Sequence, residues 1–164
     1  MGETGLEYSL HMVLDRGVYE KMNSLNSITD RLSPELKKRG YNKRKLSWYK
    51  QMNGTTVVFA IQRSQYSSDV WYYNYGIGIN SFFESSITSL SRCDVVYRLD
   101  QKLHEKLITC EHLISILDYW EKEYGRDLNT LKEKAIQNKL PRQTTRKAVQ
   151  FLTSFNAGRA FSLS

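Results

Sequence analysis

The residue types that most often carry out catalysis or bind metal ions are few in this sequence and lie far apart. Its histidines are His11, His104 and His112, and its cysteines are Cys93 and Cys110. His104 and His112 are eight residues apart on an expected helix, about two turns, so they could share a face but not one metal ion. The cysteines lack the spacing of a metal site or of a redox pair. We therefore expect no catalytic residues, no metal and no cofactor.

Four polar residues lie inside or at the ends of segments that are otherwise apolar and strand-like. They are Gln62, Arg63, Asn74 and Arg98. A guanidinium in such a place needs hydrogen-bonding partners, and side-chain amides on neighbouring strands can supply them. Two interpretations remain open. These residues form either the base of a site that binds a ligand or a partner, or a structural polar network.

The most cationic part of the sequence runs from residue 37 to residue 50, with aromatic residues between the cations. The candidate partner-binding residues in this run are three consecutive cations and a tryptophan: Lys43, Arg44, Lys45 and Trp48. Cations could neutralise phosphates while aromatic rings stack on bases, or the same cations could meet an acidic protein surface. Because Trp48 and Tyr49 alternate on an expected strand, one of the two should face the core.

A second cationic segment lies near the C-terminus. No acidic residue occurs between residues 36 and 68 or after Glu133, and these two acid-free segments hold 14 of the 24 lysines and arginines. The formal net charge is +7. If both segments lie on one surface, their field should accelerate association with an acidic partner and weaken with added salt.

Hydrophobic periodicity predicts the elements that must position these residues. Steps of three and four predict a helix over residues 18–36, interrupted at Ser33-Pro34, with Gly40 after its C-terminus. From residue 46 the period changes to two, and strands are predicted over residues 46–52, 55–65, 70–80 and 95–99. Asn53-Gly54 predicts a hairpin turn between the first two strands. Gly76 and Gly78, on one face of the third strand, suggest close approach of a helix or a bulge.

The last third of the chain is expected to be helical. One helix is predicted from a cap at Asp100 to Gly125, a second from about Leu128 that is closed by Leu140-Pro141, and a third from a cap at Thr144 or Thr145 to just before Gly158. The order of elements predicts an α+β fold. We expect an antiparallel four-stranded meander with an N-terminal helix and C-terminal helices packed on one face.

Composition limits the class of protein. Among the 164 residues, 40% are hydrophobic and 25% are charged, which is typical of a globular domain. The sequence has no apolar run long enough to cross a membrane, and its beginning does not have the pattern of a secretory signal. Two cysteines are expected to be reduced thiols, so we expect a cytoplasmic protein. The predicted organisation is an N-terminal arm (1–17), one α+β domain (18–140), and a basic C-terminal helix and tail (141–164).

Four short motifs follow one another in the middle of the chain. They are Pro34-Glu35-Leu36-Lys37 leading to Gly40-Tyr41, then Ser47-Trp48-Tyr49-Lys50, then Ile61-Gln62-Arg63-Ser64, and then Asn74-Tyr75-Gly76-Ile77. In this order they resemble the bacterial domain-of-unknown-function family 4304, over roughly residues 18–140. Arg98 is similar to the arginine of a later strand in that family, whereas Tyr41 replaces a phenylalanine. The resemblance implies a fold but no established chemistry, and some members of the family occur where toxin-immunity proteins are expected.

Three functions remain as hypotheses. The first is a non-catalytic protein-binding module, most concretely an immunity protein that occludes a bacterial toxin and favours an acidic partner surface. The second is a nucleic-acid-binding protein that uses the basic segments 37–50 and 134–159. The third is an enzyme whose site the sequence does not reveal. No membrane partner is expected.

Overall fold

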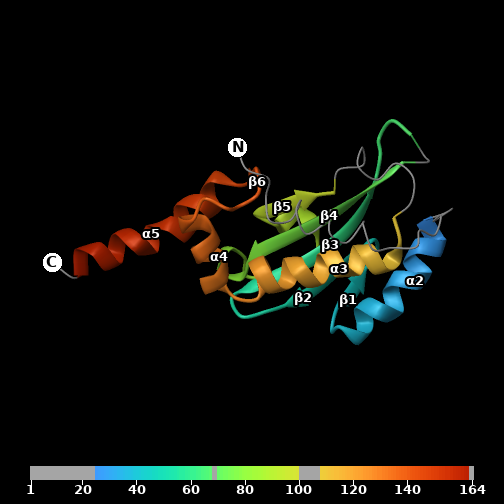
Figure 1. Cartoon of the computed structure of the whole chain (residues 1–164), viewed down its shortest axis with the longest axis horizontal. Helices are drawn as coiled ribbons and strands as arrows, with labels where there is room; N and C mark the ends of the chain where they lie inside the picture. Colours follow the sequence, from blue (N-terminus) through green and yellow to red (C-terminus); the bar gives the residue numbers. More distant parts are fainter. Residues whose placement is uncertain (1–24, 68–69, 100–107, 163–164) are drawn as a thin grey trace.

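One antiparallel sheet forms the centre of the protein (Figure 1). The computed structural model describes residues 25–67, 70–99 and 108–162, with side chains up to residue 154. The strands pair in chain order: β1 (Asn42–Arg44), β2 (Ser47–Gln51), β3 (Thr55–Arg63), β4 (Trp71–Ile79), β5 (Val95–Arg98) and β6 (Gln143–Thr144). The predicted α+β class and antiparallel meander are confirmed, but the sheet has six strands instead of four.

The two additional strands, β1 and β6, are the edges of the sheet. In β1 all three residues are exposed, and the turn into β2 contains Lys45 at a φ of 55°. In β6 only two polar residues pair with β5. Because neither edge strand buries a face, neither has the alternation of apolar and polar residues that a sequence pattern detects.

Helix α2 (Leu25–Lys38) passes through Pro34 without the predicted interruption. A proline inside a helix costs about 3 kcal/mol. Leucines 32 and 36, on either side of it, are fully buried together with Ile28, and each such burial is worth roughly 1.5–3 kcal/mol. Packing therefore outweighs the lost backbone hydrogen bond. Gly40 follows the helix at a φ of 86°, as expected for a helix C-terminus.

Helix α3 (Cys110–Trp120) begins later than predicted. Thr109 is its N-cap and accepts a hydrogen bond from the backbone of His112, while Ile108 and Thr109 are not helical. The expected cap Asp100 lies outside the described residues. After Trp120 the helix widens into a π-helical turn, η4 (Glu121–Gly125).

The last two helices begin at clear caps. Asp127 caps α4 (Leu128–Ile136), and the Thr145 hydroxyl accepts a hydrogen bond from the Ala148 backbone at the start of α5 (Arg146–Ser162). Helix α5 continues through Gly158, so the predicted end there is wrong. Its second half extends away from the rest of the molecule (Figure 1). Its first turns belong to the core through Ala148 and Leu152.

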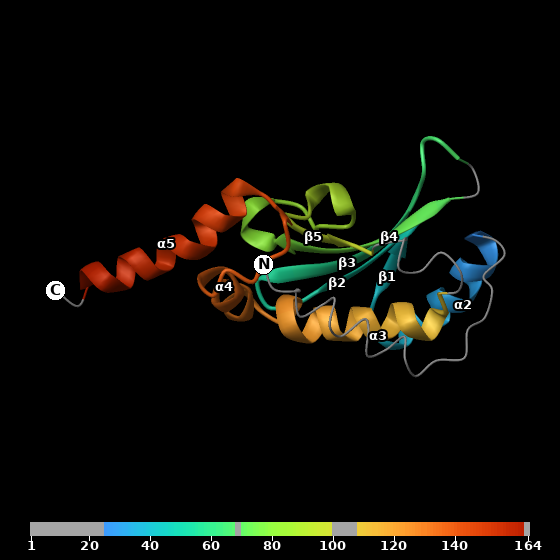
Figure 2. The ribbon, with the colours of Figure 1, turned by 45° about the horizontal axis from the view of Figure 1, so that its top comes forward.

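Helices α2 and α3 lie on one face of the sheet (Figure 2). A row of four rings crosses this face, each ring opposite the next on the neighbouring strand: Trp48, Phe59, Tyr75 and Tyr97. Successive ring centroids are 5.7, 5.1 and 6.2 Å apart. This aromatic row forms the middle of the main core and makes the sheet rigid across four strands.

The opposite face, called here the second face, carries Val58, Ala60 and the two glycines of β4. Segment 80–93, with the 3₁₀ turns η1 (Asn80–Phe82) and η2 (Leu90–Arg92), covers part of it (Figure 2). A Cβ atom on Gly76 would lie 2.7 Å from the Cys93 sulfur, and one on Gly78 would overlap Ile87. The predicted close approach to these glycines is therefore confirmed, but it is made mainly by side chains of the covering segment and not by an α-helix or a bulge. Beyond this cover, Gln62 and Arg98 are exposed.

Candidate functional site

The predicted partner-binding residues lie in three places. Gln62, Asn74 and Arg98 come together on the second face. Arg63 follows Gln62 on β3, so it lies on the other face, where it is exposed. The remaining four surround the β1–β2 turn: Lys43, Arg44, Lys45 and Trp48.

Arg98 is held by two amides and a ring. Its Nε–H donates to Asn74 Oδ1 at 2.9 Å, and Nη2 donates to Gln62 Oε1 at 2.7 Å. The centre of its guanidinium lies 4.7 Å from the centroid of the Tyr72 ring. Among the described residues no carboxylate forms an ion pair with Arg98. The side chain is therefore oriented by neutral groups, which leave its positive charge intact.

Asn74 lies on the buried side of Arg98 and accepts one of its hydrogen bonds. Its side chain is fully buried, and its Nδ2 group has no hydrogen-bond partner among the described residues. Because Oδ1 accepts from Arg98, the orientation of the amide is assigned from that bond. A buried donor without a partner costs roughly 1–3 kcal/mol. As a purely structural network, this cluster is therefore incomplete.

Asn74 and Arg98 belong to a row of residues that lie directly opposite one another across five strands. We call this set the polar row: Arg44, Ser47, Ala60, Asn74 and Arg98. It has an arginine at each end, and four strand spacings put these ends roughly 19 Å apart. The Arg44 Nη1 group donates to the Thr88 hydroxyl of the covering segment at 2.9 Å. On each shared strand, the residue of the polar row is the sequence neighbour of the residue of the aromatic row. Because neighbouring residues of a strand point to opposite faces, the polar row lies on the second face, directly behind the aromatic row.

Trp48 does not belong to an accessible surface. Its side chain is 1% exposed and packs against Phe59. Lys43 lies over the Trp48 ring, with its Nζ 5.4 Å from the centroid. Trp48 was a candidate for contact with a partner, and this is wrong because the alternation of β2 directs it into the core. Its neighbour Tyr49 packs on the second face.

The two acid-free segments do not form one surface at the sheet. Strand β1, which contains Lys43 and Arg44, is one edge, and β6, which lies beside Arg142 and Arg146, is the other. Five strand spacings of about 4.8 Å separate these edges by roughly 24 Å. This exceeds the Debye length of about 8 Å at physiological salt, so the two clusters act largely as separate fields.

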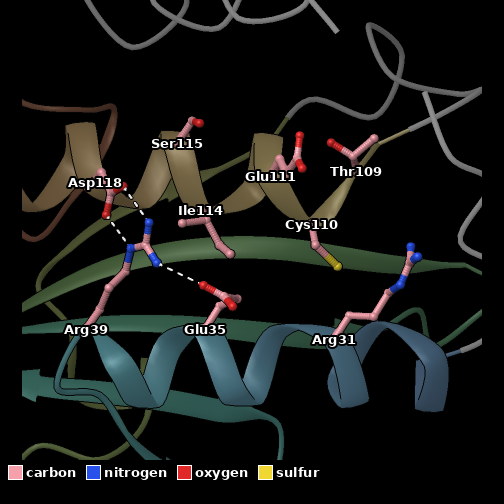
Figure 3. A pocket seen from close by; sticks show the side chains of 9 residues that line it. All are labelled: Arg31, Glu35, Arg39, Thr109, Cys110, Glu111, Ile114, Ser115 and Asp118. Atoms are coloured by element: carbon pink, nitrogen blue, oxygen red, sulfur yellow. Dashed lines mark hydrogen bonds and ion pairs between the residues drawn. The ribbon is translucent and has the colours of Figure 1, made fainter. Parts of the chain in front are cut away.

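A hollow of about 700 Å³ lies between α2 and α3 (Figure 3). Its lining is mostly polar: Arg31, Glu35, Arg39, Thr109, Cys110, Glu111, Ile114, Ser115 and Asp118. Arg39 reaches across it and donates to Asp118 at 3.0 Å and to Glu35 at 3.5 Å. The hydrogen bond to Asp118 is the main cause of the raised pKa of Arg39. Here the arginine is neutralised by two acids, and it acts as a strut between the helices.

A second ionic cluster continues along the same side. Lys50 Nζ lies 2.7 Å from Glu121 Oε1, and the Tyr41 hydroxyl donates to Glu121 Oε2 at 2.8 Å. Burial, together with the Glu121 charge, raises the pKa of Tyr41. A tyrosine in this state stays protonated, so it acts as a hydrogen-bond donor to the carboxylate. These groups tie β2 to the end of α3.

Sequence reasoning missed Tyr72 beside Arg98 and the hollow between α2 and α3. Tyr72 has the same position in the strand alternation as Asn74, which would have placed its ring beside Gln62 and Arg98. The hollow depends on which residues of two helices face each other, and periodicity does not give this.

Among the described residues, no group of three or more His, Cys, Asp and Glu could hold a metal ion, and no helix is long and apolar enough to cross a membrane.

Comparison with known proteins identifies a family for this sequence. A family model described as "Domain of unknown function (DUF4304)" matches residues 32–152. No curated protein and no solved structure matches the sequence. The matched region contains all six strands and therefore the whole polar row.

Proposed function

The chain belongs to the DUF4304 family, as its motifs indicated, and we propose that it is a non-catalytic protein-binding module that docks a partner on the polar row. One observation carries the proposal. The Arg98 end of the polar row lies where the cover over the second face stops, so Arg98 and the neighbouring Gln62 are exposed while Asn74 beneath them is fully buried. Polar side chains built on strands and fixed from below are typical of a preorganised recognition surface.

The charge of this surface favours an acidic partner. The arginines at its two ends, Arg44 and Arg98, are both exposed, so they add a positive field that speeds association with an acidic surface. Tyr72 is half-buried beside Arg98 and offers an aromatic contact. Tyrosine and arginine are enriched among the residues that contribute most to binding energy at interfaces.

The most concrete form of this function is an immunity-type inhibitor that occludes a bacterial toxin in the cytoplasm. Such an inhibitor needs a rigid surface that binds without rearrangement, and the aromatic row beneath the polar row supplies that rigidity. Cys93 and Cys110 are free thiols, which suits a reducing compartment. Nucleic-acid binding receives less support, because Trp48 is buried and the two basic edges lie far apart.

Site-specific photo-crosslinking tests the proposal. A photoreactive phenylalanine analogue replaces Gln62 on the second face or, as the matched control, Ser115, which is exposed on α3. In the native host we expect one discrete protein adduct from position 62 and none of that mass from position 115. Binding of the purified partner should then weaken in the Arg44→Glu, Arg98→Glu double variant. Equal adducts from both positions, or adducts with nucleic acid alone, would contradict the proposal.

A further inference from the structure

We propose that the polar row binds a carboxylate side chain of the partner, an aspartate or a glutamate, held by two parallel hydrogen bonds from the Arg98 guanidinium. This inference rests on the proposed function and names the chemical group that the site recognises. It starts from the hydrogen bonds that Arg98 does not make.

A guanidinium has five N–H donors, and Arg98 uses one on Nε and one on Nη2. Both of these bonds are made from the edge of the guanidinium that contains Nε and Nη2. The two N–H groups of Nη1 and the second N–H of Nη2 have no partner among the described residues. Two of these donors, one from each terminal nitrogen, form the pair that matches the two oxygens of a carboxylate.

The side chains that contact Arg98 leave its positive charge available to bind an anion. Asn74 and Gln62 are neutral amides, so they fix the guanidinium in place without cancelling its charge, and Tyr72 supports its flat side. Arg39 shows the alternative, because it lies between Asp118 and Glu35 and has no need of an external anion. The same side-chain type is thus neutralised in the hollow between α2 and α3, and is left charged on the second face.

Local charge favours a carboxylate over a phosphate group. Within the polar row the other arginine lies roughly 19 Å from Arg98, so at this end of the row Arg98 contributes a single positive charge, which suits a single negative charge. The buried Nδ2 of Asn74 is an unpartnered donor next to the same guanidinium.

Nuclear magnetic resonance titration of the full chain tests the inference. The probe is a triglutamate peptide with blocked ends, and the reference probe is the corresponding triglutamine peptide. We expect triglutamate to shift the Arg98 Nε–H signal and the Gln62 side-chain amide signals saturably, and triglutamine to leave both in place. Inorganic phosphate at the same concentration should bind more weakly than triglutamate.

Three variants assign the effect to the guanidinium. Arg98→Lys keeps the charge but loses the fork, and we expect triglutamate to bind it at least tenfold more weakly. Gln62→Glu alters an exposed residue, so it should fold normally, and its carboxylate should occupy Arg98 and cause a similar loss. Arg63 follows Gln62 on β3 but lies on the other face. The control variant Arg63→Gln removes this cation and should bind triglutamate within twofold of the wild type.

Wild-type affinity in Arg98→Lys, an equal loss in Arg63→Gln, or tighter binding of phosphate would overturn the carboxylate assignment. The crosslink from position 62 is independent of these results. If that crosslink forms while triglutamate leaves Arg98 unshifted, the partner docks here through other chemistry and only this inference is wrong. If both fail, the proposed function is wrong as well.

Discussion

Gly125 lies so close to Val57 that a Cβ atom on Gly125 would overlap the Val57 Cγ2 methyl group. Gly125 is at the end of the π-helical turn, and Val57 is near the start of β3. The Thr55 hydroxyl donates to the Gly125 carbonyl oxygen at 2.7 Å and holds them together. The wider π-helical turn thus presses its backbone directly onto the sheet, and only a residue without a side chain fits at this point.

Gly125→Ala should therefore destabilise the protein by about 1–3 kcal/mol, the usual cost of overpacking a core. The direction of the effect is itself informative, because a glycine-to-alanine change that meets no crowding stabilises by about 0.4–1 kcal/mol. Urea unfolding measures the difference. In the double variant with Val57→Ala the cost should be smaller than the sum of the two single changes. Additive costs would show that the overlap with Val57 is not the cause.

Leu117 is 1% exposed and belongs to the main core with Trp120. Leu117→Ala should lower the free energy of unfolding by roughly 2–5 kcal/mol, because it leaves a cavity beneath the sheet. Ile136→Ala removes an aliphatic side chain that is 50% exposed, and should cost less than about 1 kcal/mol. Thermal and urea unfolding of both variants would check this, and a loss below about 0.5 kcal/mol for Leu117→Ala would mean that α3 packs elsewhere.

Asn74→Ala should destabilise the protein by about 1–2 kcal/mol, since it removes the buried acceptor of the Arg98 Nε–H. The loss is limited because the unpartnered Nδ2 donor disappears with it. Gln62→Ala removes the exposed acceptor of the same guanidinium and should cost less than about 0.5 kcal/mol. The comparison is made by urea unfolding. A larger loss for Gln62→Ala than for Asn74→Ala would reverse the roles given to the two amides.

Alkaline pH should weaken the fold through its buried tyrosines. Burial is the largest cause that raises the pKa of Tyr73 to about 12 and that of Tyr124 to about 12, whereas a tyrosine in an unfolded chain ionises near pH ~10. The folded state thus favours the neutral side chains. Their contribution to stability is complete below about pH 10 and is lost as the pH rises toward about 12.

The measurement is urea unfolding at a series of pH values, with phenolate absorbance followed in parallel. The free energy of unfolding should fall between about pH 10 and 12. The Tyr73→Phe, Tyr124→Phe double variant lacks both ionising groups, so its stability should fall less steeply over this range. An unchanged slope would assign the effect to other groups.

The interior strands and helices of the fold could be predicted because their apolar residues alternate along the strands or recur every three or four residues along the helices. The alternation of Val57, Phe59 and Ile61 predicted β3, and the spacing of the apolar residues predicted α3 and α4. The helix break at Pro34 was predicted wrongly, because local propensity does not include the burial of Leu32 and Leu36. The π-helical turn was also missed, and its contact with β3 joins segments that are distant in sequence.

At the candidate site, residue type identified Gln62, Asn74 and Arg98, and register brought them together. Polar residues in apolar strands need partners, and this rule selected these three residues together with Arg63, which lies on the other face. It could not place Arg44 in the same row, because β1 has no detectable pattern. Nor could it show that the two basic segments lie at opposite edges, since strand order is a property of the whole sheet.

The cations on the short edge strands have a further consequence, for aggregation. An edge strand has unpaired backbone N–H and C=O groups, to which a strand of another molecule can add. Here one edge is three residues long and carries Lys43 and Arg44, and the other is two residues long and lies between Arg142 and Arg146. Two such edges repel each other and offer few hydrogen bonds. These charges therefore keep copies of the sheet from joining end to end at high concentration, even where they contact no partner.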